Sequence, residues 1–198
     1  DNSDVSWAYH ASRGWNYPNL IDYMDNHDEE RLMFESLSYG NSSAGYNVKD
    51  SLTAIQRMEM AAVQFMGIPG PKMMYEFTEQ AYDYSIFFNG DRVAAKPVRW
   101  DYLDQPARER VNRVTGAMAK LRKSDAFRFG TFTKDMGGFG KRMWITHSSM
   151  DVVIALNMGV TGFDMAPGFT KNGTWYDYFT GETINITNAS TQTFYFKP

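Results

Sequence analysis

The chain has 198 residues, 43% of them hydrophobic, which is enough to bury a core in one large domain or two small ones. Its 20 basic and 23 acidic residues are spread along the sequence and give a net charge of -3, which argues against a nucleic-acid partner. No apolar run approaches the roughly 18 residues of a membrane span, and the absence of cysteine excludes disulfides and thiolate metal sites while leaving the compartment open.

The first predicted element is a short strand from Leu20 to Met24 that runs into the polar cluster DNHD at residues 25–28. Side chains at the C-terminal ends of parallel strands project into the crevice above the sheet, so this cluster is a candidate site. The simpler interpretation is a solvated turn before a helix, with Asp28 as the helix cap and Glu29 and Glu30 in the first turn. A short helix is expected from Glu29 to Leu37.

A parallel crossover unit is predicted next. After a polar loop at residues 38–47, apolar residues recur at helical spacing from Asp50 to Met66, with Asp50 at the N-cap. The segment GIPGP at 67–71 ends this helix, and Lys72 to Phe77 restarts as a run of strand length. A strand, a helix and a second strand joined by short links form a parallel unit.

Residues 78–103 form a long loop, and long loops after strands in such folds tend to carry function. A second amphipathic helix is predicted from about Asp104 to Lys123, with Pro106 in its first turn. From Asp125 onward no helical period remains, which predicts a domain boundary at 124/125 and an antiparallel β-sandwich behind it. The expected strands of that sandwich are 127–133, 141–147, 152–158, 175–179, 182–186 and 191–196.

Two motifs lie in a fixed order on either side of the first long helix. The first is YMDNHD at 23–28, and the second is GIPGP at 67–71 followed by Met73-Met74-Tyr75 and Glu79. In this order, with a β module behind them, they resemble the last barrel strands and the C-terminal domain of the α-amylase family, glycoside hydrolase family 13. The stretches DYSI at 83–86 and KPVRWDY at 96–102 also resemble the corresponding loop of bacterial amylases.

The resemblance implies a fold with an α/β part and an all-β part. Residues 1–124 would be about the last quarter of a TIM (β/α)8 barrel, and residues 125–198 an antiparallel β-sandwich domain. Two parallel strands cannot close a barrel, so their open edges are expected to pair with the missing N-terminal part of the barrel or with another copy of the chain. The resemblance also implies a secreted or periplasmic bacterial protein.

By resemblance, Asp28 matches the third carboxylate of the family's catalytic trio, and His27 the adjacent imidazole that binds the same sugar. An ionised Asp accepts hydrogen bonds from neighbouring sugar hydroxyls, and these strengthen in an oxocarbenium-like transition state. Asn26, Tyr75 and Glu79 are the further candidate substrate-binding residues. The alternatives are core packing for Tyr75 and stabilisation of the loop for Glu79.

Retaining hydrolysis needs two more carboxylates, a nucleophile and a general acid. The family carries them in a G-x-R-x-D stretch and a separate Glu motif, and neither precedes Asn19. The expected function is therefore the C-terminal portion of a retaining hydrolase of starch or related α-glucans, inactive by itself. No metal or cofactor is expected in this chain, although the family's calcium could be bound by the full-length enzyme. The alternatives are a non-catalytic carbohydrate-binding module and a purely structural β module attached to such an enzyme.

Overall fold

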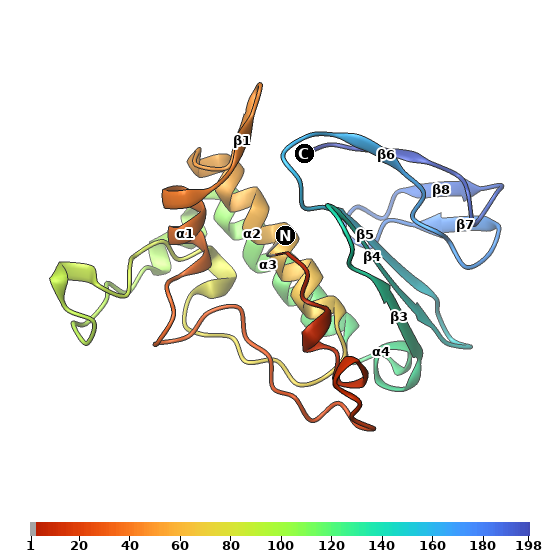
Figure 1. Cartoon of the computed structure of the whole chain (residues 1–198), viewed down its shortest axis with the longest axis horizontal. Helices are drawn as coiled ribbons and strands as arrows, with labels where there is room; N and C mark the ends of the chain where they lie inside the picture. Colours follow the sequence, from red (N-terminus) through yellow and green to blue (C-terminus); the bar gives the residue numbers. More distant parts are fainter. Residues whose placement is uncertain (1–2) are drawn as a thin grey trace.

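The computed structural model describes residues 3–198 and places a helical part before a β part (Figure 1). The α-helices are α1 (Leu32–Tyr39), α2 (Ser51–Gly67), α3 (Pro106–Leu121) and α4 (Asp125–Phe129), and the 3-10 helices are η1 (Ser6–Ala8), η2 (His10–Arg13), η3 (Thr78–Gln80), η4 (Phe88–Gly90) and η5 (Trp100–Asp104). The strands are β1 (Ser42–Ser43), β2 (Tyr46–Asn47), β3 (Thr131–Asp135), β4 (Gly140–Thr146), β5 (Val152–Asn157), β6 (Phe163–Met165), β7 (Gly173–Tyr176), β8 (Thr183–Ile186) and β9 (Phe194–Phe196).

The two predicted barrel strands are parallel neighbours, but they pair over one bridge alone. Asp22 and Lys72 form this parallel bridge. The Asp22 amide donates to the Pro71 carbonyl at 3.2 Å, and the Met73 amide donates to the Asp22 carbonyl at 2.8 Å. Across residues 3–198 the strands form small sheets and no closed barrel. The predicted parallel unit is therefore present, and α2 lies in the connection between its two strand segments. The pairing of these two segments is short.

Helices α2 and α3 pack against each other and confirm the two periodic segments of the sequence. Asp50 is the N-cap position of α2, and Pro106 is the first residue of α3. Their apolar faces share one core with the β part, in which Val63 and Met118 from the helices join Met143 and Ile145 from β4. A buried core of this kind, and not helix propensity, supplies most of the stability of such helices.

The end of α2 approaches the β part closely. A Cβ added at Gly67 would lie 2.8 Å from both Ile154 Cδ1 and Met143 Cε, so glycine permits this packing. The turn that follows is held by Arg122, whose guanidinium donates to the carbonyls of Met66 at 2.5 Å, Ile68 at 2.8 Å and Gly70. This turn sets the direction of the segment that begins at Lys72.

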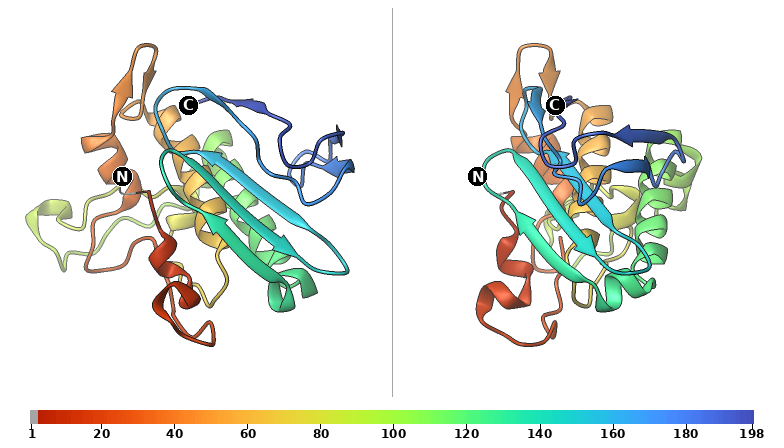
Figure 2. Two further views of the ribbon diagram at one scale, coloured as in Figure 1. Left: turned by 45° about the vertical axis from the view of Figure 1, so that its right-hand side comes forward. Right: turned by 90° about the vertical axis from the view of Figure 1, so that its right-hand side faces the viewer.

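The β part is antiparallel throughout its paired strands, as predicted. Strands β3, β4 and β5 form a three-stranded sheet in that order, while β6 pairs with β9 and β7 with β8. The two small sheets lie beyond β5 (Figure 2). A cavity of about 1370 Å³ is lined by residues of α2, α3, β5, β7 and β8. The face-to-face packing of a sandwich is not confirmed by this arrangement, and the domain boundary at 124/125 stays a prediction.

Three local predictions were wrong, and one strand was missed. The helix expected from Glu29 begins at Leu32, because residues 29–31 belong to the preceding turn and Arg31 is the N-cap. The strand expected from Phe127 begins at Thr131, because α4 occupies Asp125–Phe129 after the N-cap Ser124. The loop at 38–47 contains the small β1–β2 hairpin around Gly45, whose φ of 81° favours glycine. The strand β6 was not predicted.

Within the described residues no helix is long and apolar enough to cross a membrane.

Candidate functional site

The polar cluster after Met24 forms an irregular turn whose backbone is fixed by Asn26. The Asn26 side-chain oxygen accepts hydrogen bonds from the amides of Asp28 at 2.6 Å and Glu29 at 3.0 Å. Asn26 is buried, whereas His27 and Asp28 are exposed. Because the helix cap is Arg31, the interpretation of Asp28 as a capping residue is wrong. Asn26 therefore holds the turn, and the turn presents His27 and Asp28 to solvent.

Each carboxylate oxygen of Asp28 has a partner. Arg92 Nη2 lies 2.9 Å from Oδ1 and also donates to the Asp28 carbonyl at 2.5 Å. His27 Nε2 lies 3.3 Å from Oδ2, and the side chains of His27 and Asp28 are 76% and 62% exposed. A carboxylate this exposed stays available to the hydroxyls of a bound ligand, because its present partners compete with water.

A buried polar layer lies directly beneath the turn. Thr78 Oγ1 donates to Asp25 Oδ1 at 2.5 Å, and the Arg31 guanidinium lies 3.9 Å from Asp25 Oδ2. Burial raises the pKa of Asp25, while the Thr78 hydrogen bond and the Arg31 charge act in the opposite direction. Arg31 also donates to the Glu76 carbonyl at 3.0 Å, which ties the end of the first strand segment to the second. Arg31 is thus a structural partner of the buried Asp25 carboxylate.

Asp25 makes a testable contribution to the pH dependence of stability. Its pKa is raised in the folded chain, so the fold favours the protonated form, and the free energy of unfolding falls as pH rises from 3.8 through the raised value. Replacing Asp25 by Asn is expected to flatten this dependence in urea titrations measured between about pH 3.5 and 7. The exposed Asp164→Asn exchange serves as the control, and an equal slope in Asp25→Asn and in the parent chain would contradict the assignment.

The other two predicted ligand-binding residues lie on the neighbouring segment. The Tyr75 ring faces the Arg31 guanidinium, with 4.0 Å between the ring centroid and Cζ, so this face is occupied. Glu79 lies in η3 and accepts a hydrogen bond from Gln80 at 3.4 Å. Within residues 3–198 neither is hydrogen-bonded to residues 26–28. The structure therefore joins Asn26, His27 and Asp28 in one turn, and in the described residues Tyr75 contacts Arg31 and Glu79 contacts Gln80 instead.

A projecting loop, residues 85–97, extends from the body of the molecule beyond the site (Figure 1). Its two stems are joined to each other: Arg99 donates to the Tyr84 hydroxyl at 2.9 Å, and the Tyr82 hydroxyl donates to the Pro97 carbonyl at 2.6 Å. Burial raises the pKa of Tyr82 to about 12, so this hydroxyl remains a donor at neutral pH. The base of the loop is therefore fixed.

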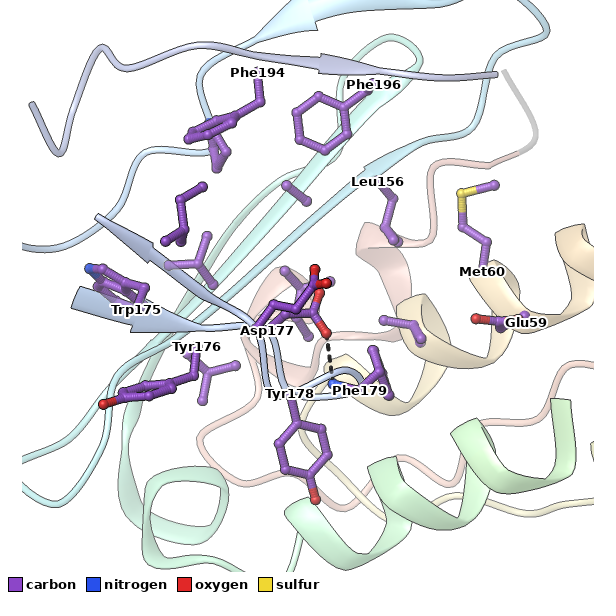
Figure 3. A pocket seen from close by; sticks show the side chains of 18 of the residues that line it. Glu59, Met60, Leu156, Trp175, Tyr176, Asp177, Tyr178, Phe179, Phe194 and Phe196 are labelled. Carbon is purple, nitrogen blue, oxygen red and sulfur yellow. Dashed lines mark hydrogen bonds between the residues drawn. The ribbon is translucent and has the colours of Figure 1, made fainter. Parts of the chain in front are cut away.

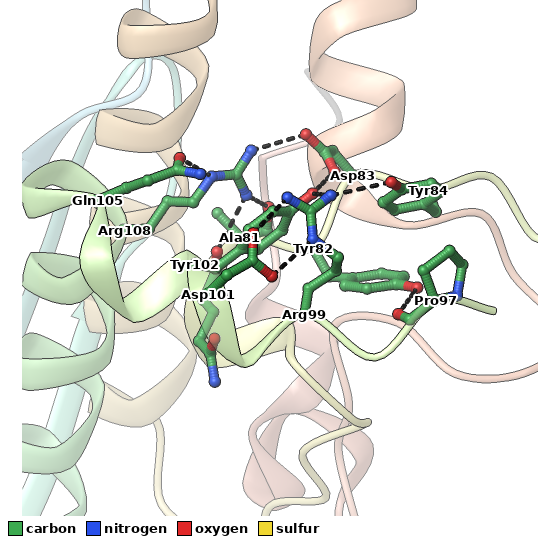
Figure 4. A network of polar contacts seen from close by, with 11 residues as sticks. Ala81, Tyr82, Asp83, Tyr84, Pro97, Arg99, Asp101, Tyr102, Gln105 and Arg108 are labelled. Atoms are coloured by element: carbon green, nitrogen blue, oxygen red, sulfur yellow. Dashed lines mark hydrogen bonds and ion pairs between the residues drawn. The ribbon is translucent and has the colours of Figure 1, made fainter.

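The stems are anchored to α3 through a polar network (Figure 4). Arg108 pairs with Asp83 at 2.6 Å, and the Tyr102 hydroxyl donates to the same carboxylate. The Tyr102 ring lies between two guanidinium groups, 4.0 Å from Arg99 Cζ and 3.8 Å from Arg108 Cζ. Cation–π contacts of this kind, together with the ion pair, hold the loop stems against the helix.

Sequence reasoning missed two residues of the site. Glu30 Oε1 accepts hydrogen bonds from Ser85 Oγ at 3.1 Å and from the Ile86 amide at 2.5 Å, and Arg92 reaches Asp28 from the tip of the projecting loop. Both contacts span more than fifty residues, and neither pair has a spacing or motif that marks it. Among residues 3–198, no three metal-ligating side chains gather as a metal site would require, and the calcium of a longer enzyme stays a prediction.

Solved structures match this chain, whereas family models and curated sequences do not. No protein-family model matches the chain, and the search of curated proteins found no relative. The structure of AmyP in complex with maltose matches 94% of this chain with a TM-score of 0.67 and 13% identity. An Anoxybacillus α-amylase matches 91% with a TM-score of 0.63 and 18% identity, and the Geobacillus thermoleovorans α-amylase complexed with acarbose matches 92% with a TM-score of 0.61 and 16% identity.

The match covers 41%, 36% and 38% of the lengths of those three structures, respectively. At identities this low the similarity establishes the fold and leaves the activity to be argued from the site. The order of the elements agrees with the resemblance in the sequence, in which two strand segments and their helices precede an antiparallel β part. The chain therefore has the fold of the C-terminal part of α-amylase-type glycoside hydrolases.

Proposed function

We propose that the chain contributes the Asp28 carboxylate to the α-glucan site of a retaining glycoside hydrolase of the α-amylase type. The observation that carries the proposal is the position of Asp28, exposed on a turn that follows a strand segment and stands beside a buried polar layer. The neighbours crystallised with maltose and acarbose support a glucan as the ligand class. Those ligands belong to the neighbouring proteins, and for this chain a glucan ligand is part of the proposal.

In this proposal the residues of the turn have distinct roles. The Asp28 oxygens accept hydrogen bonds from two neighbouring sugar hydroxyls, and these bonds strengthen as the ring distorts towards the transition state. His27 donates to a hydroxyl of the same sugar, and Asn26 keeps both side chains in place through the backbone of the turn. Tyr75 and Glu79 border the site from the adjacent segment.

The open strand edges favour a partner that completes the barrel. Ile21, Tyr23 and Met73 are exposed beside the Asp22–Lys72 bridge, with 60%, 45% and 39% of their surface accessible. Apolar side chains along an unpaired strand edge are a pairing site for further strands. We propose that residues 1–124 form the last part of a (β/α)8 barrel, that the preceding barrel strands cover this edge, and that the enzyme acts outside the cytoplasm.

The nucleophile and the general acid of a retaining mechanism have no matching motif in the sequence, so the 198-residue chain is expected to leave starch intact. The same chain is expected to bind maltotriose through residues 26–28. A reducing-sugar assay and a maltotriose titration of the chain followed by two-dimensional NMR measure the two outcomes. Clear hydrolysis would place the catalytic carboxylates elsewhere, and the lack of binding at residues 26–28 would contradict the proposed site.

A carbohydrate-binding function of the β part is the second candidate, and the cavity beside β5 favours it (Figure 3). Trp175, Tyr176, Tyr178 and Phe179 line its β side, and aromatic rings can stack on sugars. The lining contributed by α2, α3 and β5 includes Val63, Leu121 and Ile154, whose side chains offer no hydrogen bonds to hydroxyls. Because the β part also shares its core with α2 and α3, we assign it a stabilising role and place the glucan at Asp28.

A further inference from the structure

We infer that Arg92 is a positioning residue, which fixes the Asp28 carboxylate against the projecting loop and makes this loop one wall of the sugar site. The inference deepens the proposed function and rests on it. It concerns a residue that lies 64 positions from Asp28 in the sequence and meets it only through the fold.

The contact at the tip of the loop restrains both the main chain and the side chain of Asp28. One nitrogen of Arg92, Nη2, donates to the Asp28 carbonyl at 2.5 Å and to Oδ1 at 2.9 Å. The second oxygen, Oδ2, faces His27 Nε2 at 3.3 Å. Together these contacts select one orientation of the carboxylate, with one oxygen towards the loop and the other towards the imidazole.

The base of the loop is tied to the same turn by an independent contact. Glu30 accepts hydrogen bonds from Ser85 and Ile86 at the start of the loop. Further along, the Lys96 ammonium donates to the Arg92 carbonyl, and Asp91 accepts from the Val93 amide at 2.9 Å, which gives the tip a defined shape. The loop is therefore preformed, and the contact between Arg92 and Asp28 sets the position of its tip.

The Arg92 side chain is 44% exposed, so its ion pair with Asp28 is of the weak, exchangeable kind. Removing the guanidinium is therefore expected to increase the amide exchange rates at the tip about two- to fivefold without unfolding the chain. A lysine keeps the charge and lacks the planar arrangement of donors, so it should restore part of the effect. Asp28→Asn removes the charge from the other side and should loosen the tip to a similar extent.

Amide hydrogen exchange of the 198-residue chain tests the contact. The Gly90 and Ala94 amides, which donate to the carbonyls of Phe87 and Asp91, report on the loop. We expect them to exchange about two- to fivefold faster in Arg92→Gln and Asp28→Asn, and by less than that in Arg92→Lys. Arg128→Gln, which changes an exposed arginine on α4, is the matched control and should leave them unchanged. Identical exchange in Arg92→Gln and the parent chain would overturn the contact.

A maltotriose titration of the same variants tests the role and separates it from the proposed function. If the parent chain binds through residues 26–28, Arg92→Gln should bind about two- to fivefold more weakly, with Arg92→Lys in between. Binding by the parent chain with equal affinity in Arg92→Gln would overturn the positioning role and leave the proposed function intact. A parent chain that shows no perturbation at residues 26–28 would contradict the proposed function itself, and the inference with it.

Discussion

Replacing Lys72 by methionine is expected to lower the free energy of unfolding by about 3–5 kcal/mol, because it leaves the Asp22 carboxylate buried without its charge partner. Lys72 Nζ lies 2.6 Å from Asp22 Oδ2, and the two side chains are 4% and 2% exposed. Asp22 Oδ1 already lacks a hydrogen-bond partner within the described part of the chain. Urea unfolding of the variant and of Lys120→Met, an exposed lysine on α3, measures the difference.

Replacing both partners should have a much smaller effect than replacing one. Burial lowers the pKa of Lys72 in spite of the neighbouring Asp22, so the attraction within the pair does not fully offset the loss of hydration. An Asp22→Leu/Lys72→Met chain is therefore expected to be as stable as the parent, or more stable by up to about 4 kcal/mol. If Lys72→Met alone costs less than about 1 kcal/mol, in the range of an exposed pair, the buried bridge is not formed as described.

Replacing Arg108 by methionine is expected to cost about 3 kcal/mol and to release the stems of the projecting loop. The Arg108 side chain is 5% exposed and pairs with Asp83 at 2.6 Å. It also donates to the carbonyls of Gln80, at 3.1 Å, and Ala81. Removing one guanidinium therefore leaves one oxygen of the Asp83 carboxylate and two backbone carbonyls without this donor, and each such loss is costly in a buried place.

Arg113 on the same helix is the matched control for Arg108. Its side chain is 65% exposed and pairs with Glu109 one turn away at 2.8 Å, so Arg113→Met should cost about 0.5 kcal/mol or less. Thermal or urea unfolding of the two variants gives the comparison, and hydrogen exchange of residues 78–103 shows whether the loop has loosened. Equal costs for Arg108→Met and Arg113→Met would mean that the network in Figure 4 does not hold the loop.

The elements with long periodic patterns could be predicted from the sequence. Helices α2 and α3 agree with their apolar spacing to within a few residues, and β4 and β5 lie where short apolar or aromatic runs predicted strands. Short elements could not be predicted in this way. The run Phe127–Phe129 alternates like a strand, but it lies in the short helix α4, which begins after the N-cap position Ser124 and ends at the C-cap position Gly130, whose amide donates to the Ala126 carbonyl.

The site was predicted in part. The turn with Asn26, His27 and Asp28 follows from its position after a strand, but the partners of Asp28 do not follow from any spacing. Arg92 reaches Asp28 because the stems of the projecting loop are tied together at Tyr84 and Arg99 and anchored on α3. Contacts that depend on how a loop folds back over the chain are set by packing, which a single sequence does not display.

The proposed role of Asp28 depends most directly on where this chain binds a glucan. A maltotriose titration followed by two-dimensional NMR of the 198-residue chain, with Asp28→Asn as the paired variant, measures it. We expect shifts at Asn26, His27 and Asp28 and along the projecting loop, and weaker binding once the carboxylate is replaced by an amide. Shifts confined to the aromatic residues of β7 and the following turn, equal in both chains, would contradict it and assign glucan binding to the β part.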